Sequence, residues 1–266
     1  MSDLHNNPAA RYGGATRTAA EIDQGLRSYM LGVYNYMTIG LAITGLFALG
    51  IYMLSITSDA SAAAKTATGA AAAIARGQFL TPLGYTLFAT PLKWVVVLAP
   101  LALVFFLSFR VDKMSVGAGQ LTFWIYAALV GVSLATILMV YTHTSVARVF
   151  FISAASFGAL SLYGYTTKRD LSGMATFLFM GLIGVIIASI VNIFLGSSML
   201  QWIISIVGLL VFAGFTAYDT QDIKNMYDAN DDSTVSGRKS IMGALRLYLD
   251  FLNIFLFMLQ LFGNKE

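Results

Sequence analysis

The feature that most constrains this chain is one long stretch without charge. From Leu171 to Tyr218 the sequence contains no Asp, Glu, Lys or Arg. A membrane-spanning helix needs only about 20 mostly apolar residues, so this stretch is too long for a single span. Within it, "GSSMLQ" from Gly196 to Gln201 supplies small and polar residues that favour a turn. We therefore predict two consecutive spans, one on each side of this turn.

The composition of the whole chain agrees with a membrane protein. Of the 266 residues, 58% are hydrophobic and only 11% are charged, whereas soluble domains carry about 25% charged residues. The absence of cysteine excludes disulfides, thiolate metal sites and cysteine nucleophiles. The formal net charge of +3 is modest, so nucleic acid is not an expected partner. The bilayer itself is the expected environment.

Seven apolar stretches are long enough to span a membrane, which predicts an all-α integral membrane protein built as a seven-transmembrane-helix bundle. Residues 1–28 form a polar tail without the pattern of a cleavable signal peptide. Residues 29–266 form the membrane domain, with a long outer loop at 55–91 and an inner loop at 219–240. The spans are Tyr29–Leu54, Leu92–Phe109, Leu121–Tyr141, Val149–Tyr165, Met174–Leu195, Leu200–Ala217 and Ile241–Phe262.

The distribution of basic residues predicts the orientation. If the N-terminus lies in the cytosol, most of the 16 Lys and Arg residues fall in inner segments, as the positive-inside rule favours. The outer loop then contains the alanine-rich piece "DASAAAKTATGAAAAIARG", which we interpret as a variable surface loop. The N-terminus is therefore expected to be cytosolic.

Two aspartates stand out because ionisable residues at membrane depth are costly and usually functional. Asp219 lies five residues before Lys224, about 7.5 Å along a helix, and Asp250 lies four residues after Arg246, about 6 Å. Both basic residues are interpreted as interface anchors, since long cationic side chains extend to the membrane surface. The aspartates therefore reach a similar depth on consecutive helices, near the cytosolic side.

A pair of facing carboxyl groups would have defined chemistry. Two negative charges in a poorly hydrated site repel, so such a pair tends to share one proton and to titrate as a unit. When deprotonated, the same oxygens suit a hard cation such as calcium. Asp219 alone could instead be an ordinary residue at a helix end, whereas Asp250 lies within an apolar segment, where Asp is among the costliest residues. Arg110 is either a positive-inside anchor or a partner for one aspartate.

Four long segments resemble the Bax-inhibitor family of membrane proteins, and in particular its bacterial members. "FAGFTAYDTQDIKNMY" (Phe212–Tyr227) is similar to the family's signature, and "TPLKWVVVLAPLALVFF" (Thr90–Phe106) also fits it. The resemblance covers nearly all of the chain from the first span onward. The other two segments are "FFISAASFGALSLYGYTTKRDLS" (Phe150–Ser172) and "LRLYLDFLNIFLFMLQLFG" (Leu245–Gly263).

This resemblance implies a bundle whose last helix is central and is wrapped by the other six. It also implies a pH-sensitive calcium leak in the bacterial inner membrane, with the gating aspartates at Asp219 and Asp250 and a possible latch at Arg110. Calcium would then be a transported or transiently bound ion, with no resident cofactor. The stretch Trp94–Phe109 lacks the glutamate that some members carry on the second helix. Bacterial relatives have also been linked to a membrane-bound ATP-dependent protease.

Three functions are therefore compared. A proton-gated cation leak, which is not an enzyme, uses the aspartate pair directly. A regulator without transport activity would bind another membrane protein, such as that protease. An intramembrane aspartyl protease would need one acid and one base flanking a water, but the glycine-rich context expected before its second aspartate is missing at Leu247–Leu249. A retinal-type receptor is excluded because the seventh segment, Ile241–Phe262, carries no lysine for a Schiff base.

Overall fold

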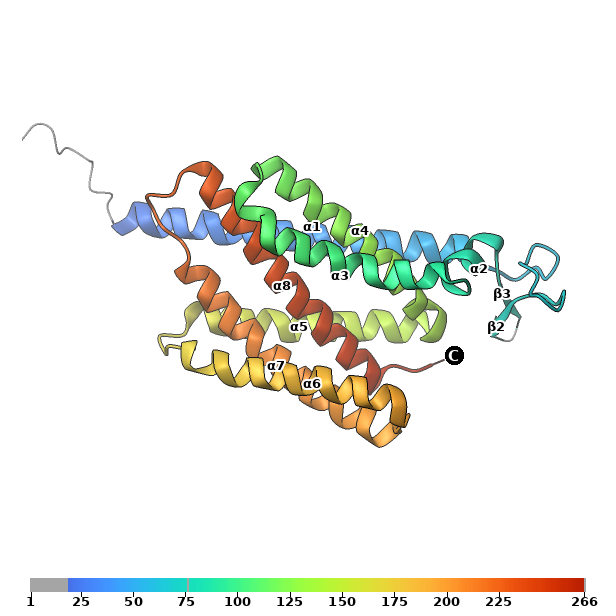
Figure 1. Ribbon diagram of the computed structural model, residues 1–266. Coiled ribbons are helices and arrows are strands. Elements are labelled where there is room, and N and C mark those ends of the chain that lie inside the picture. Colours follow the sequence, from blue (N-terminus) through green and yellow to red (C-terminus); the bar gives the residue numbers. More distant parts are fainter. Residues whose placement is uncertain (1–18, 76, 266) are drawn as a thin grey trace, which may run out of the picture.

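A computed structural model describes residues 19–75 and 77–265 and shows an all-α membrane protein (Figure 1). Within these residues, seven helices are long and apolar enough to cross a membrane, which confirms the predicted fold class. The helix bounds are α1 Ala19–Ser55, α3 Leu92–Arg110, α4 Val116–Val140, α5 His143–Thr166, α6 Ala175–Leu195, α7 Ser198–Asn225 and α8 Ser233–Phe262.

The uncharged stretch is divided where the sequence predicted. α6 ends at Leu195, and Gly196 follows in the left-handed region at φ 60°, a conformation that glycine adopts without steric cost. Ser197 then caps α7 by accepting a hydrogen bond from the Leu200 backbone nitrogen at 3.3 Å. α6 and α7 are therefore two antiparallel helices joined by a short turn, and they pack against each other.

The last helix, α8, packs against α7, α1, α5 and α4, and it crosses the bundle obliquely between them (Figure 1). Its side chains form much of the buried core. Tyr248 is fully buried, and its ring meets the rings of Phe123 and Tyr126 edge-on. That α8 is wrapped by all six other helices stays a prediction.

A polar contact fixes α8 to α1 inside this core. The hydroxyl groups of Tyr248 and Thr44 are hydrogen-bonded at 2.6 Å, and Thr44 also donates to the Ala127 carbonyl on α4 at 2.9 Å. Because Thr44 has a single proton, its bond to the carbonyl leaves Tyr248 as the donor in the first contact. Three helices are thus joined by one buried hydroxyl pair.

The helices extend further into the predicted flanking segments than the hydropathy pattern indicated. α1 begins at Ala19, ten residues before the predicted start of the first span. Only 226–232 of the predicted inner loop, 219–240, lie outside α7 and α8. Hydropathy ends where polar side chains begin, but a helix can continue into the interface, since its backbone hydrogen bonds do not depend on apolar side chains.

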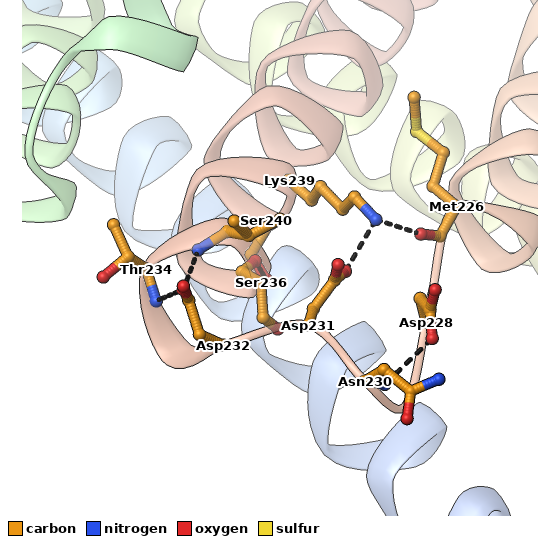
Figure 2. A network of polar contacts seen from close by, with 10 residues as sticks. Met226, Asp228, Asn230, Asp231, Asp232, Thr234, Ser236, Lys239 and Ser240 are labelled. Carbon is orange, nitrogen blue, oxygen red and sulfur yellow. Dashed lines mark hydrogen bonds and ion pairs between the residues drawn. The ribbon is translucent and has the colours of Figure 1, made fainter.

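Side chains fix the short α7–α8 linker, as Figure 2 shows. Lys239 donates to the Met226 carbonyl at 2.9 Å and pairs with Asp231 at 2.6 Å. Asp232 caps α8 by accepting hydrogen bonds from the backbone nitrogens of Thr234 and Val235, both at 2.8 Å. The linker therefore sets where α8 begins relative to the end of α7.

The long loop at 55–91 contains structure that the sequence did not predict. Three short antiparallel strands, β1 Ile56–Thr57, β2 Ala73–Ala75 and β3 Gln78–Leu80, form a sheet in the order β1-β3-β2. The short helix α2 Pro82–Phe88 follows the sheet. Some of the small alanine side chains of this loop pack inside it, and three of them, Ala63, Ala64 and Ala72, are buried. In Figure 1 the sheet lies at the opposite end of the bundle from the start of α1.

Candidate functional site

The two intramembrane aspartates meet where α7 crosses α8. The carboxyl groups of Asp219 and Asp250 lie close together at the wall of one cavity, and a hydrogen bond between two carboxyl groups requires one shared proton, because a carboxylate can only accept. Asp250 is only 4% exposed, and its Oδ2 atom is buried without a hydrogen-bond partner. Asp219 is partly buried. The geometry therefore holds a carboxyl pair away from bulk water.

An ion pair lies next to the carboxyl pair. Nη1 of Arg246 donates to Oδ2 of Asp222 at 2.6 Å, and about one third of each side chain is exposed. Asp222 lies three residues after Asp219 on α7, and Arg246 lies four residues before Asp250 on α8. Residues three or four apart share a helix face. One face of each helix thus contributes two charged residues to the same place.

These four charged side chains line a cavity of about 360 Å³ between α6, α7 and α8. The remaining wall is mostly aromatic and aliphatic, which keeps the carboxyl groups in poorly hydrated surroundings. Its other lining residues are Phe179, Leu182, Phe212, Phe215, Tyr218 and Leu249.

The site is not a preformed metal centre. Among residues 19–75 and 77–265, no group of three or more His, Cys, Asp or Glu side chains is placed to hold a metal ion. Asp219 and Asp250 could supply carboxylate oxygens to a calcium ion, which takes six to eight oxygen ligands. Water and backbone carbonyls would have to supply the others.

Arg110, the predicted latch, is not part of this cavity. It is exposed at the end of α3, and the two ion pairs of the described chain, Lys239–Asp231 and Arg246–Asp222, do not include it. The guanidinium beside the aspartates belongs instead to Arg246. The structure therefore brings Asp219 and Asp250 together but leaves Arg110 apart.

Sequence reasoning treated Arg246 as an interface anchor and did not single out Asp222. A signal was nevertheless present, because the spacings of three residues from Asp219 to Asp222 and four from Arg246 to Asp250 place each pair on one helix face. What the sequence could not show is that the two faces meet. That depends on the crossing of α7 and α8.

A second polar cluster lies toward the other end of the same helices. The side-chain amide of Gln201 and the hydroxyl of Ser205 both donate to Oε1 of Gln260 at 2.8 Å, and Asn192 donates to Gln201 at 3.2 Å. Through these contacts the side-chain amides of Asn192, Gln201 and Gln260 join neighbouring helices. α6, α7 and α8 are thus linked by polar side chains as well as by apolar packing.

An apolar layer separates this cluster from the aspartate pair. The Phe257 ring of α8 lies directly against Gly208 of α7, where an added Cβ would come within 2.4 Å of the ring. Phe212 packs against Phe257 with 6.1 Å between ring centroids. Along the α7–α8 interface, two polar layers are therefore separated by aromatic rings.

Comparison with known proteins identifies the relatives of this chain. The family model described as "Inhibitor of apoptosis-promoting Bax1" matches residues 26–266. The inner membrane protein YbhL of Escherichia coli strain K12 is 43% identical over 244 residues, covering 91% of this chain and 94% of that protein. An uncharacterized protein of Rickettsia prowazekii is 43% identical over 246 residues, covering 92% of each chain.

A third relative extends over the full length. An uncharacterized protein of Caulobacter vibrioides is 39% identical over 268 aligned residues, covering 100% of both chains. The family model includes both helices that carry the aspartates, together with the five other candidate spans apart from the start of α1. The chain belongs to the family of membrane proteins described as inhibitors of apoptosis-promoting Bax1.

Proposed function

We propose that this protein is a pH-sensitive cation leak, with calcium as the favoured ion, and that the Asp219–Asp250 pair controls its opening. The observation that carries the proposal is the pair of carboxyl groups that α7 and α8 bring together at the wall of the cavity. Ionisable residues at membrane depth are costly, and they mark ion pathways and proton relays. A pair whose bond depends on one proton links protonation directly to helix packing.

The protonated pair holds the path closed. One carboxyl group donates to the other, and this bond holds α7 against α8. Loss of the shared proton leaves two negative charges in a cavity with apolar walls, where their repulsion is weakly screened. The contact then loosens, and four carboxylate oxygens become available to a divalent cation. Calcium flux should therefore rise as pH increases.

Arg246 sets how readily the pair loses its proton. Its guanidinium lies at the wall of the same cavity as Asp219 and Asp250, and a nearby positive charge favours the ionised form of a carboxyl group. Asp222, bonded to the same guanidinium, reduces that effect. Opening also has to separate Phe257 from Phe212, because these rings lie between the aspartate pair and the second polar cluster, which contains Gln201 and Gln260. The proposed gate therefore has a charged part and an aromatic part.

The test is calcium flux into liposomes containing the purified full chain, measured over a pH series. Wild-type flux should rise with pH, and Asp219→Asn or Asp250→Asn should each remove the pH dependence, because an amide cannot release the shared proton. Lys113→Gln, an exposed residue following α3, is the control and should behave as wild type. Unchanged flux and unchanged pH response in both aspartate variants would contradict the proposal.

The same preparations separate this proposal from its alternatives. A regulator without transport activity would show no flux above protein-free liposomes, yet would still co-purify with a membrane protease after both aspartates were replaced. An aspartyl protease would cleave a membrane peptide and lose that activity in either aspartate variant. The name of YbhL places that relative in the inner membrane, and we propose the same location here, with a cytosolic N-terminus.

A further inference from the structure

A large groove lies between α1 and α5, away from the aspartate pair. Its volume is about 670 Å³, and its lining is almost entirely apolar. Several of its lining residues are exposed on the flanks of the two helices, including Leu31 at 52% and Leu162 at 63%. Because both helices are candidate membrane spans, this groove faces the hydrocarbon of the bilayer. Its apolar lining suits part of an acyl chain.

One end of the groove carries positive charge. Arg27 of α1 lines it, is exposed, and takes part in neither ion pair of the described residues. Asp23, one turn earlier on α1, does not pair with it. On the α5 side, Tyr165 lines the same groove, and Nζ of Lys224 lies 5.1 Å from the centroid of its ring. The groove is therefore apolar along its length and cationic at one end.

The position of the charge matches the position of a headgroup. Arg27 lies near the start of α1 and Tyr165 near the end of α5, where the chain leaves the membrane segment and the basic Lys168 and Arg169 follow. Arginine binds phosphate through a planar fork of donors. Basic residues beside a span attract anionic lipid at the membrane surface. An anionic glycerophospholipid has both required parts, with its phosphate at the membrane surface and its acyl chains extending into the bilayer.

The wall of the groove is fixed in place, so that its shape does not depend on the ligand. The hydroxyl groups of Tyr34 and Ser161 are hydrogen-bonded at 2.7 Å across it, and Ser161 is bonded to Thr220 of α7 at 2.9 Å. Two side chains that line the groove are therefore joined to each other and to the bundle behind them. A preformed groove binds a flexible chain at lower entropic cost than one that must first be ordered.

We propose that the α1–α5 groove binds one anionic phospholipid, with its phosphate at Arg27 and an acyl chain along Tyr34, Phe157 and Gly158. The lipid comes from the leaflet at the Arg27 end of the bundle. This site is separate from the cavity that holds Asp219 and Asp250, so the proposal does not depend on calcium transport.

Native mass spectrometry of the full chain released from nanodiscs tests this site. The nanodiscs contain equal amounts of phosphatidylglycerol and phosphatidylethanolamine, and the wild-type protein should retain one phosphatidylglycerol. Arg27→Gln should lower that retention roughly fivefold, which is the effect of one basic residue at an anionic surface. Lys113→Gln removes an exposed cation elsewhere on the protein and should leave retention unchanged.

A second pair of variants tests the apolar part without disturbing the fold. An added Cβ at Gly158 of α5 would meet no atom within 4 Å, so Gly158→Leu should fold normally and fill the groove, abolishing lipid retention. Gly184 of α6 is equally unobstructed and lies outside the groove, so Gly184→Leu should retain the lipid.

Three results would overturn the proposal. Equal retention of the two lipids would show that no anionic headgroup is selected. Retention that is unchanged in both Arg27→Gln and Gly158→Leu would place the lipid elsewhere. A dimer that dissociates in Gly158→Leu would show that a second copy of the chain, rather than lipid, covers the groove.

Discussion

Nη1 of Arg246 donates to Oδ2 of Asp222 at 2.6 Å, at the wall of the cavity that Asp219 and Asp250 also line. The ion pair joins α8 to α7 one helical turn from the carboxyl pair. Two contacts of different chemistry thus connect the same helices, and loss of the shared proton weakens only one of them. The ion pair keeps a positive charge beside the aspartates in either protonation state.

Changing this ion pair should shift the pH at which flux is half-maximal. Arg246→Gln removes the positive charge that favours ionised aspartates, so the flux midpoint should move to higher pH. Asp222→Asn removes a negative charge and leaves the guanidinium to act on Asp219, so the midpoint should move to lower pH. Calcium flux in liposomes over a pH series measures both variants.

The opposite signs make this prediction specific. A general loosening of the α7–α8 contact would move both variants in the same direction, and that result would contradict the proposed electrostatic role. Lys113→Gln again serves as the control for loss of one exposed cation.

The close approach of α5 to α7 should make one glycine essential for folding. A Cβ added at Gly164 would lie 2.2 Å from the backbone oxygen of Ala217, which cannot move without shifting α7. Gly164→Ala should therefore reduce the amount of folded protein strongly. Gly158→Ala, on the same helix, meets no atom within 4 Å and should be tolerated. Size-exclusion chromatography of the two variants compares their folding, and equal yields would refute the argument.

The sequence predicted the elements of this fold better than their contacts. Charge-free runs and the Gly196–Gln201 turn located the spans, since both signals are local. Depth counted from Lys224 and Arg246 placed Asp219 and Asp250 at one level. The sequence could not show that Arg246, rather than Arg110, lies beside the two aspartates, because this depends on how α3 and α8 pack. The sheet at Ile56–Leu80 was missed because alanine gives little strand signal.

Removing the Thr44 hydroxyl should destabilise the fold more than removing the Tyr248 hydroxyl to which it is hydrogen-bonded. Thr44→Val leaves the fully buried Tyr248 hydroxyl without the hydrogen bond to Thr44, and an unsatisfied buried hydroxyl costs about 1–3 kcal/mol. Tyr248→Phe leaves the single hydroxyl proton of Thr44 within reach of two backbone carbonyls, those of Gly40 and Ala127, and should cost less, about 1 kcal/mol. Thermal unfolding in detergent measures both, with Tyr163→Phe, an exposed tyrosine, as the control. A larger loss for Tyr248→Phe would contradict this assignment of donor and acceptor.

The aromatic layer should limit flux even when the aspartate pair is protonated. Phe257 fills the space above Gly208 and contacts Phe212, so Phe257→Ala removes the ring that separates the aspartates from the Gln201–Gln260 cluster. Water can then enter the α7–α8 interface, and calcium flux at low pH should rise above the wild-type level. Phe262→Ala, on the same helix but 63% exposed, removes an identical ring from the lipid-facing surface and should not change flux. If low-pH flux stayed at the wild-type level in folded Phe257→Ala protein, the carboxyl pair alone would close the path, and the aromatic layer would serve only helix packing.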